Sequence, residues 1–346
     1  MKKLIIDVCG ADAGPLPVIE GAATALLDSA DLYADLAGSE PQIRAVMRER
    51  GVPEDRYGVL HTDEYVTNHD DPMCVMSDKD NSSLVLALKA LRDDPQAVGM
   101  VSAGNTGAVM IGTILYLGLL PGLRQPTLAT VLPTEGDRYI CIADCGANVD
   151  CKAADMIGFA LMGDEYMKCM CGVPSPRVGL LSVGREDGKG SQRAREAYEE
   201  IKNLPLDFIG NVEGSDVLSD ICDVVVCDGF SGNVILKNAE AVGKYAGRLA
   251  EATLRRYAES MGETADEGAV DALRRSFFRQ FDFNSQGGAF FFGTVKPVVK
   301  MHGAANSSTT VSCVKQALAL DASGFTDRLR TVLKDKLPPR RLITRK

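Results

Sequence analysis

The fold is decided by an apolar run that ends in a polar, glycine-rich loop: Ala97-Val98-Gly99-Met100-Val101 followed by Ser102-Ala103-Gly104-Asn105-Thr106-Gly107-Ala108. The same arrangement recurs at residues 139–150, 223–234 and, less regularly, 297–308. Continuous apolar runs are typical of buried parallel strands, and the ligands of such sheets bind beyond the carboxyl ends of the strands. The pattern therefore predicts an α/β fold whose loops converge on a polar cleft.

Length and charge describe a globular protein with an acidic balance. The chain has 346 residues and a formal net charge of −9, whereas proteins that bind nucleic acid over a broad surface are usually basic. We therefore expect no nucleic-acid partner. No stretch approaches the roughly 18–20 consecutive apolar residues of a membrane span, and the apolar run after Met1-Lys2-Lys3 is too short for a signal peptide. These features predict a cytoplasmic protein.

The ten cysteines indicate reduced, structural thiols rather than a metal site or a nucleophile. Cys141, Cys145 and Cys227 lie in or beside expected strands, where cysteine behaves as a small apolar residue. The closest pair, Cys169 and Cys171, has no second pair at the spacing of a zinc site. We therefore expect neither a metal nor a covalent cysteine intermediate.

One long segment breaks the alternation of strands and helices. Residues 237–283 have the pattern of two long helices joined near residues 262–268, and four of their arginines are candidates for a docking surface: Arg255, Arg256, Arg274 and Arg275. The hairpin either packs on the body or a partner subunit with its arginines in solvent, or projects to dock an acidic partner or anionic lipid. We expect one α/β unit over residues 1–335 with the hairpin inserted at about 237–286, and a basic tail at 336–346.

The loop after the first apolar run supplies one set of candidate site residues. Ser102, Gly104, Asn105, Thr106 and Gly107 combine hydroxyls, an amide and glycines, which suits a tetrahedral anion or a carbonyl oxygen. The same residues also suit a tight strand-to-helix turn capped by Asn105 or Thr106. No Gly-Lys-Ser/Thr follows, so the loop is not a nucleotide-binding P-loop.

The other loops leave similar alternatives open. Asn148 can point into the cleft and Asp144 can orient a base or a cation, although such residues also cap helices. The loop after the third run repeats this pattern with Asp228, Ser231, Gly232 and Asn233. Lys189 between two glycines suits either a phosphate or a solvated turn. His302 suits an acid, an oxyanion donor or a structural role.

Taken together, these motifs resemble the bacterial phosphate acyltransferase family, PlsX. The resemblance rests on residues 102–108, 146–151, 178–184, 208–214 and 224–234, with Lys189-Gly190 and Val299-Lys300-Met301-His302-Gly303, in the same order and spacing over about residues 3–320. Three segments differ from the family pattern: Ala11 stands where Gly is usual, Asp78-Lys79-Asp80-Asn81 replaces more basic residues, and Ala304-Ala305 replaces two serines.

The resemblance implies a three-layer α/β/α fold with a mostly parallel sheet, of the isocitrate/isopropylmalate-dehydrogenase-like kind, with a projecting helical hairpin and assembled as a homodimer. It implies transfer of an acyl group from acyl-[acyl-carrier protein] to inorganic phosphate without a cofactor. The acyl phosphate would then feed a glycerol-3-phosphate acyltransferase in phospholipid synthesis. The family is cytosolic and contacts the inner face of the cell membrane peripherally through its hairpin.

We hypothesise direct displacement by phosphate, and this mechanism assigns roles to individual residues. Catalysis falls to Asn148, Lys189, Asn233 and His302. Binding of phosphate and substrate falls to Ser82, Ser83, Ser102, Gly104, Asn105, Thr106, Gly107, Asp144, Asp228, Ser231 and Gly232. The carrier protein or the membrane meets Arg255, Arg256, Arg274 and Arg275.

Three other functions remain open at this point. A phosphotransacetylase-like enzyme acting on acyl-CoA needs the same cleft with a nucleotide pocket in place of a docking face. A metal-dependent hydroxy-acid dehydrogenase needs clustered aspartates and a nicotinamide site, and the sequence has neither clearly. A non-catalytic membrane-associated scaffold would bind the carrier protein without turnover.

Overall fold

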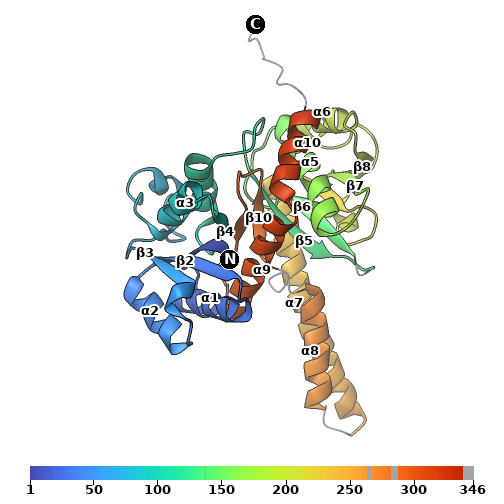
Figure 1. Cartoon of the computed structure of the whole chain (residues 1–346). Helices are drawn as coiled ribbons and strands as arrows, with labels where there is room; N and C mark the ends of the chain where they lie inside the picture. The colour runs from blue at the N-terminus through green and yellow to red at the C-terminus, as the bar shows by residue number, and fades with distance from the viewer. Residues whose placement is uncertain (137, 263–265, 282–286, 338–346) are drawn as a thin grey trace.

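In the described part of the chain, eleven strands form one sheet through the centre of the molecule (Figure 1). The computed structural model describes residues 1–136, 138–262, 266–281 and 287–337, and of 277–281 only the helical backbone. The strands are β1 (Lys2–Asp7), β2 (Leu32–Gly38), β3 (Tyr57–His61), β4 (Ala97–Ser102), β5 (Thr127–Pro133), β6 (Tyr139–Ala143), β7 (Arg177–Leu181), β8 (Asp207–Val212), β9 (Val224–Val226), β10 (Ala289–Phe292) and β11 (Val298–Lys300).

The strand order divides the sheet into two parallel groups. Across the sheet it is β3-β2-β1-β4-β11-β10-β5-β6-β9-β7-β8. Strand β10 is antiparallel to β11 and to β5, and β5 is antiparallel to β6, while the other pairs are parallel. Because the direction reverses an odd number of times between β11 and β6, the strands from β6 to β8 run opposite to those from β3 to β11.

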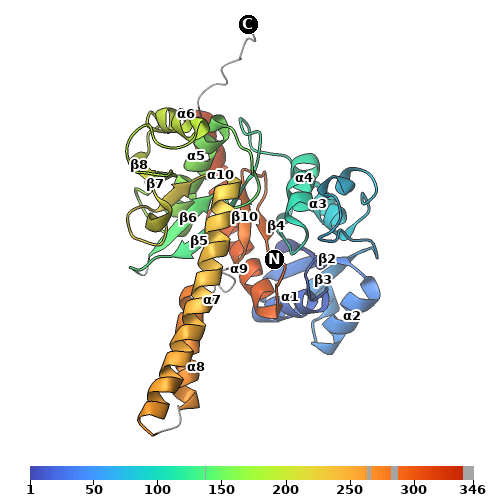
Figure 2. The ribbon, with the colours of Figure 1, turned by 180° about the vertical axis from the view of Figure 1, so that it is seen from behind.

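Helices cover both faces of the sheet, as Figures 1 and 2 show from opposite sides. The α-helices are α1 (Leu16–Asp28), α2 (Glu40–Glu49), α3 (Ser83–Asp93), α4 (Thr106–Gly112), α5 (Ala153–Met170), α6 (Gln192–Ile201), α7 (Gly229–Ser260), α8 (Glu267–Phe281), α9 (Ser307–Ala322) and α10 (Phe325–Lys336). Short helices are η1 (Glu54–Arg56), η2 (Pro72–Met76), η3 (Thr113–Leu117) and η4 (Gly214–Asp216). The mostly parallel sheet between two helical layers confirms the predicted fold class.

The strands are apolar throughout because both of their faces are buried. In β1, Leu4 and Ile6 belong to the core on the side of α1 and α9, while Ile5 belongs to the core on the side of α3. A strand with only one buried face would alternate apolar with polar residues. The continuous apolar runs of the sequence therefore follow directly from the layered architecture.

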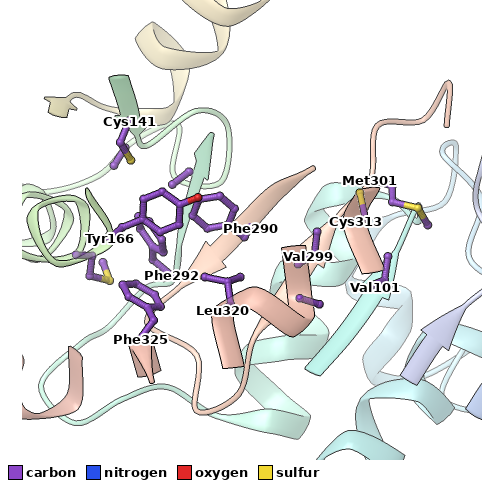
Figure 3. Close-up of a cluster of buried hydrophobic side chains, with 14 of the residues drawn as sticks. Val101, Cys141, Tyr166, Phe290, Phe292, Val299, Met301, Cys313, Leu320 and Phe325 are labelled. Atoms are coloured by element: carbon purple, nitrogen blue, oxygen red, sulfur yellow. The ribbon is translucent and has the colours of Figure 1, made fainter. Parts of the chain in front are cut away.

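An aromatic cluster supports the middle of the sheet, where the strand direction reverses (Figure 3). The ring of Tyr166 in α5 stacks on Phe290 of β10 with centroids 4.5 Å apart. Phe292 of the same strand and Phe325 of α10 lie 5.2 Å apart and complete the cluster. Such offset contacts add to the free energy that burial of the rings contributes. The cluster fixes the antiparallel strand β10 against α5 and α10.

The hairpin of α7 and α8 projects from the body, as predicted (Figures 1 and 2). Helix α7 begins earlier than the expected residue 237, because the Asp228 carboxylate accepts the Ser231 N–H at 2.7 Å and caps it. Val270 of α8 is fully buried, whereas Val242 and Leu249 of α7 are 52% and 47% exposed. No helix among the described residues combines the length and apolar content needed to cross a membrane. Residues 338–346 of the expected tail lie outside the described residues.

Candidate functional site

The predicted site residues fall into two groups at opposite ends of the strands. The β4-edge group lies at the ends of the strands of the first parallel group: it comprises the predicted Ser82, Ser83, loop 102–107 and His302, and beside them lie Asp7 and Lys300, which were not predicted site residues. The β6-edge group follows β6, β7 and β9 and comprises Asp144, Asn148, Lys189, Asp228, Ser231, Gly232 and Asn233. The two groups of loops leave the sheet in opposite directions, because β10 and β5 reverse the strand direction between them.

A row of polar side chains ends the strands of the β4 edge. Asp7, Ser102 and Lys300 occupy matching register positions on β1, β4 and β11. The Ser102 hydroxyl donates to Asp7 Oδ2 at 2.7 Å and accepts the Gly104 N–H at 3.0 Å. Burial raises the pKa of Asp7, against hydrogen bonds from Ser102 and Ser83 that lower it. Both serines therefore stabilise a buried carboxylate in the folded protein.

Lys300 is a buried cation that joins two loops. Its Nζ donates to the carbonyl of Ala103 at 3.3 Å and to that of Met301 at 2.5 Å. Burial lowers the pKa of Lys300 to about 8, although the charges of Asp7 and Asp12 act in the opposite direction. The ammonium thus holds the loop after β4 beside the loop after β11.

The backbone of the loop after β4 is packed closely against its neighbours. A Cβ on Gly10, whose φ is +87°, would stand 2.5 Å from the Cα of Gly104. A Cβ on Gly107 would stand 2.8 Å from Pro72. The Asn105 side chain caps α4, and Thr106 is the first residue of that helix. The alternative of a capped strand-to-helix turn therefore holds for Asn105.

Ser82 is used inside the fold in a similar way. It is fully buried, and its hydroxyl donates to the Lys79 carbonyl at 2.6 Å. Its position immediately before α3 makes it the N-cap residue of that helix. This hydrogen bond fixes the entry into α3 and uses the hydroxyl's only proton.

His302 is the one predicted catalytic residue of the β4 edge, and a lysine of α7 contacts it. The ring Nδ1 accepts the Ala304 N–H at 3.1 Å. The ring Nε2 lies 2.9 Å from Nζ of Lys237, which also pairs with Glu240 at 3.0 Å. Burial and then the Lys237 charge lower the pKa of His302. The ring is therefore held neutral beside a cation.

On the β6 edge, Asp144 organises its own loop. The N–H groups of Gly146, Ala147 and Asn148 donate to its carboxylate at 2.8–2.9 Å. The Asn148 amide nitrogen donates to the same carboxylate and, at 2.7 Å, to the Pro126 carbonyl. Burial raises the pKa of Asp144, and these hydrogen bonds oppose the shift. Because both amide N–H groups of Asn148 are used, neither is directed at a ligand.

The loop after β9 forms the first turn of α7. Asp228 accepts from the Ser231 N–H and hydroxyl and so acts as the helix cap. A Cβ on Gly232 would overlap the Asp144 carbonyl, so only glycine fits there. Asn233 is exposed and lies beside Gly146, where an added Cβ would stand 3.7 Å from Asn233 Oδ1. Asn233 is therefore the β6-edge amide that remains accessible to a substrate.

Lys189 lies in an exposed turn on the β6 edge. Its main-chain N–H donates to the Glu186 carbonyl at 3.2 Å, and its side-chain stem passes over Gly184. Arg193 nearby contacts Asp150, so this turn borders the Asn148 loop. Strands β11, β10, β5, β6 and β9 separate β7 from β4 in the sheet. The arrangement does not bring Lys189 to the loop 102–107.

The hairpin arginines differ in their partners. Arg255 pairs with Glu267 at 2.7 Å and with Glu251 at 3.3 Å. Arg274 pairs with the same Glu251 at 3.1 Å. Arg256 donates to a main-chain carbonyl of its own helix. The charges of Arg255 and Arg274 are therefore largely balanced within the hairpin.

Two functional candidates were not among the predicted site residues: Lys237 and Lys300. A lysine directly ending an apolar run is the signal for Lys300, since a buried strand seldom ends on a charge without a partner. The signal for Lys237 is weaker: it lies one helical turn after Asn233, on the same face of α7. Among the described residues, no three side chains of the metal-binding types gather closely enough to hold a metal ion.

The chain is similar to proteins of known name over nearly its whole length. A family model described as "Fatty acid synthesis protein" matches residues 2–328. A "Phosphate acyltransferase" of Bacillus cytotoxicus is 34% identical over 332 residues, covering 96% of this chain and 98% of that protein. One from Bacillus thuringiensis has the same identity and coverage. A phosphotransacetylase structure from Streptococcus pyogenes has a TM-score of 0.64 at 16% identity, covering 92% of this chain and 94% of that one, and shows the shared fold.

Proposed function

The chain belongs to the family of the phosphate acyltransferases and is an acyltransferase, and from that premise we propose that it transfers the acyl group of acyl-[acyl-carrier protein] to inorganic phosphate. A phosphate oxygen attacks the thioester carbonyl carbon, and the carbon–sulfur bond breaks. The proton of the phosphate ends on the thiol of the free carrier protein. The product is an acyl phosphate, which a glycerol-3-phosphate acyltransferase then consumes.

The observation that carries this proposal is the meeting of two polar regions along α7. Asn233 on the first turns of this helix borders the β6-edge loops, and Lys237, one turn further, contacts His302 of the β4 edge. Positioned donors and cations at such a junction stabilise charge that develops on an oxygen. Asn233 and His302 act on the reacting oxygens, and Asn148 and Asp144 position their loop.

The proposed partners follow from the exposed surface of the hairpin. The acidic carrier protein docks near Arg256 and Arg275 by charge complementarity. A second copy of the chain covers the apolar stripe of α7, where Val242, Tyr245 and Leu249 are 52%, 60% and 47% exposed. The distal end of the hairpin contacts the inner face of the cell membrane peripherally, and the protein otherwise resides in the cytoplasm.

The test is thiol release from palmitoyl-[acyl-carrier protein] with and without inorganic phosphate, with hydroxylamine trapping the acyl phosphate. We expect release that requires phosphate and yields a hydroxamate. Release from palmitoyl-CoA but not from the carrier protein would instead identify a phosphotransacetylase-like enzyme. Binding of the carrier protein with no release from either thioester would identify a scaffold.

A further inference from the structure

We propose that Lys237 and His302 form the binding site of the phosphate, an inference that deepens the proposed function and rests on it. The site lies where the second turn of α7 meets the loop after β11. Lys237 had no assigned role, and the loop 102–107 was the expected phosphate site. The side chains of that loop's Ser102 and Asn105 are used within the fold, whereas Lys237 is 47% exposed at its side chain and accessible to an incoming anion.

The hydrogen-bonding of the imidazole ring carries the argument. Nδ1 accepts the Ala304 N–H, so it bears no proton of its own. A neutral ring with an accepting Nδ1 must carry its proton on Nε2. That Nε2–H faces the Lys237 ammonium across 2.9 Å, and an ammonium has donors but no acceptor. Two hydrogen-bond donors therefore face each other with no acceptor between them.

An anionic oxygen placed between the two nitrogens would supply the missing hydrogen-bond acceptor. Two nitrogens that donate to one oxygen at the usual distance of about 2.8 Å stand about 4–5 Å apart. The long, half-exposed side chain of Lys237 can move outward until its Nζ stands at that distance from Nε2, while His302 is fixed by Ala304. The oxygen would then accept one charge-assisted and one neutral hydrogen bond. Phosphate fits because its remaining oxygens stay free to attack the thioester.

The surrounding charges favour an anion at this point. Lys237, Lys300 and Lys244 all act on His302 as positive charges, and Glu240 is the acidic group that opposes them. Glu240 pairs with Lys237 at 3.0 Å. A dianionic ligand would therefore meet three ammonium groups, with Glu240 opposing at Lys237 and with Asp7 and Asp12 opposing at Lys300. By bringing a negative charge to Nε2–H, it would raise the pKa of His302.

The experiment is an NMR titration of the full-length protein with inorganic phosphate. The chain has three histidines, so ring signals from selectively labelled histidine are few, and His302→Gln assigns the relevant one. We expect phosphate to shift the His302 signals and to raise the pH midpoint of its titration. The signals of His61 and His69 serve as internal controls. A His302 signal that phosphate leaves unmoved would overturn the proposal.

Variants of α7 distinguish direct contact of a lysine with phosphate from attraction by the positive charge of the region as a whole. Lys237→Met should weaken phosphate binding by about tenfold to a hundredfold, the effect of losing one charge-assisted hydrogen bond. Lys237→Arg should restore most of it. Lys244→Met removes the same charge two turns further along α7, and should change the affinity by less than about threefold. Equal affinity in Lys237→Met and the unmodified protein would refute the site.

Two further measurements distinguish a lipid headgroup from free phosphate, and failure of this site from failure of the proposed function. If vesicles of phosphatidylglycerol shifted the His302 NMR signals and inorganic phosphate did not, the proposal would be rejected in favour of a lipid headgroup. Because phosphate binding is measured without an acyl donor, the site can stand even if thiol release from acyl-[acyl-carrier protein] fails. Conversely, turnover that is unchanged in Lys237→Met would leave the proposed function intact and remove this site.

Discussion

The two polar groups of the molecule use similar residues in different ways. On the β6 edge, one carboxylate, Asp144, receives donors from its own loop, including the Asn148 amide. On the β4 edge, a comparable carboxylate, Asp7, is equally enclosed, but two nitrogens nearby, on Lys237 and His302, face each other as donors. Buried polar groups such as these two carboxylates are nearly always paired, whereas the Lys237 side chain is 47% exposed. Enclosed carboxylates therefore support these loops, whereas the facing nitrogens of Lys237 and His302 leave room for an acceptor from outside the protein.

The largest expected effect comes from breaking the packed loops of the β4 edge. Gly10→Val forces a Cβ to within 2.5 Å of the Gly104 Cα at a φ of +87°. We expect the free energy of unfolding to fall by more than about 3 kcal/mol, because backbone cannot move aside as a side chain can. Denaturant melts measure this change.

The matched control is Gly14→Val, in the same loop. Gly14 has a φ of +78°, but its Cβ would meet nothing within 4 Å. It should therefore show only the strain of the left-handed conformation, about 1–2 kcal/mol. Equal losses in the two variants would mean that close approach of the two loops contributes nothing.

The second prediction concerns Lys300, the enclosed cation of the same edge. Its pKa is lowered from the usual 10.5 to about 8 in the folded protein, so the unfolded chain binds more protons between those values. The free energy of unfolding should therefore rise with pH across this window, by up to about 3 kcal/mol from this group. Below pH 8 the full destabilisation by the buried charge is present.

Comparison with Lys300→Met isolates this contribution, because the cysteines and other groups titrate in both proteins. Urea melts at pH 7.5, 9 and 10.5 should show the unmodified protein gaining stability relative to the variant. Lys189→Met, which changes an exposed lysine, should keep the slope of the unmodified protein. Parallel pH profiles for Lys300→Met and the unmodified protein would show that Lys300 is not held in a desolvated position.

The third prediction compares two asparagines of the β6 edge. Asn233 is exposed beside Gly146, and its amide donors are accessible. Asn148 is buried, and both of its amide N–H groups are used within the protein. Asn233→Ala should therefore lower kcat by about a hundredfold, as removal of one donor to a developing oxyanion does. Its thermal melting should not change.

Asn148→Ala should mainly lower stability, because it removes one of the donors to the buried Asp144 carboxylate and the side-chain donor to the Pro126 carbonyl. Turnover measured well below the melting temperature of each variant separates the two effects. If Asn148→Ala lost turnover without losing stability, Asn148 would be the residue that acts on substrate.

The layered fold could be predicted from the sequence because a strand that is buried on both faces has apolar residues in succession. Leu4, Ile5 and Ile6 form one unbroken apolar run for that reason. The hairpin was also predictable from helical periodicity. The reversal of strand direction was not, because β10 (Ala289–Phe292) is short, and pairing partners of a short strand leave no local pattern.

The loops that carry the candidate site were predictable from the sequence, but the roles of their individual residues were not. Ser102 and Asn148 have the same local signals whether they face a ligand or a buried carboxylate, and only tertiary contacts decide between these. The contact of Lys237 with His302 joins residues far apart in sequence, and it depends on where α7 begins. That start is set by the Asp228 cap, a role that the sequence left open beside a role in the cleft.

The smallest expected effect concerns the hairpin, where one arginine has carboxylate partners and another donates to a main-chain carbonyl. Arg255 is balanced by Glu251 and Glu267, whereas Arg256 donates to a main-chain carbonyl and has no carboxylate partner among the described residues. Arg256→Gln should therefore raise the KM for acyl-[acyl-carrier protein] by about threefold at low salt, and Arg255→Gln by less. Steady-state kinetics at two salt concentrations measure this, since screening should remove the Arg256 effect at high ionic strength. An equal rise for both arginines would mean that the carrier protein displaces the ion pairs of the hairpin, and a rise for neither would place its docking surface elsewhere.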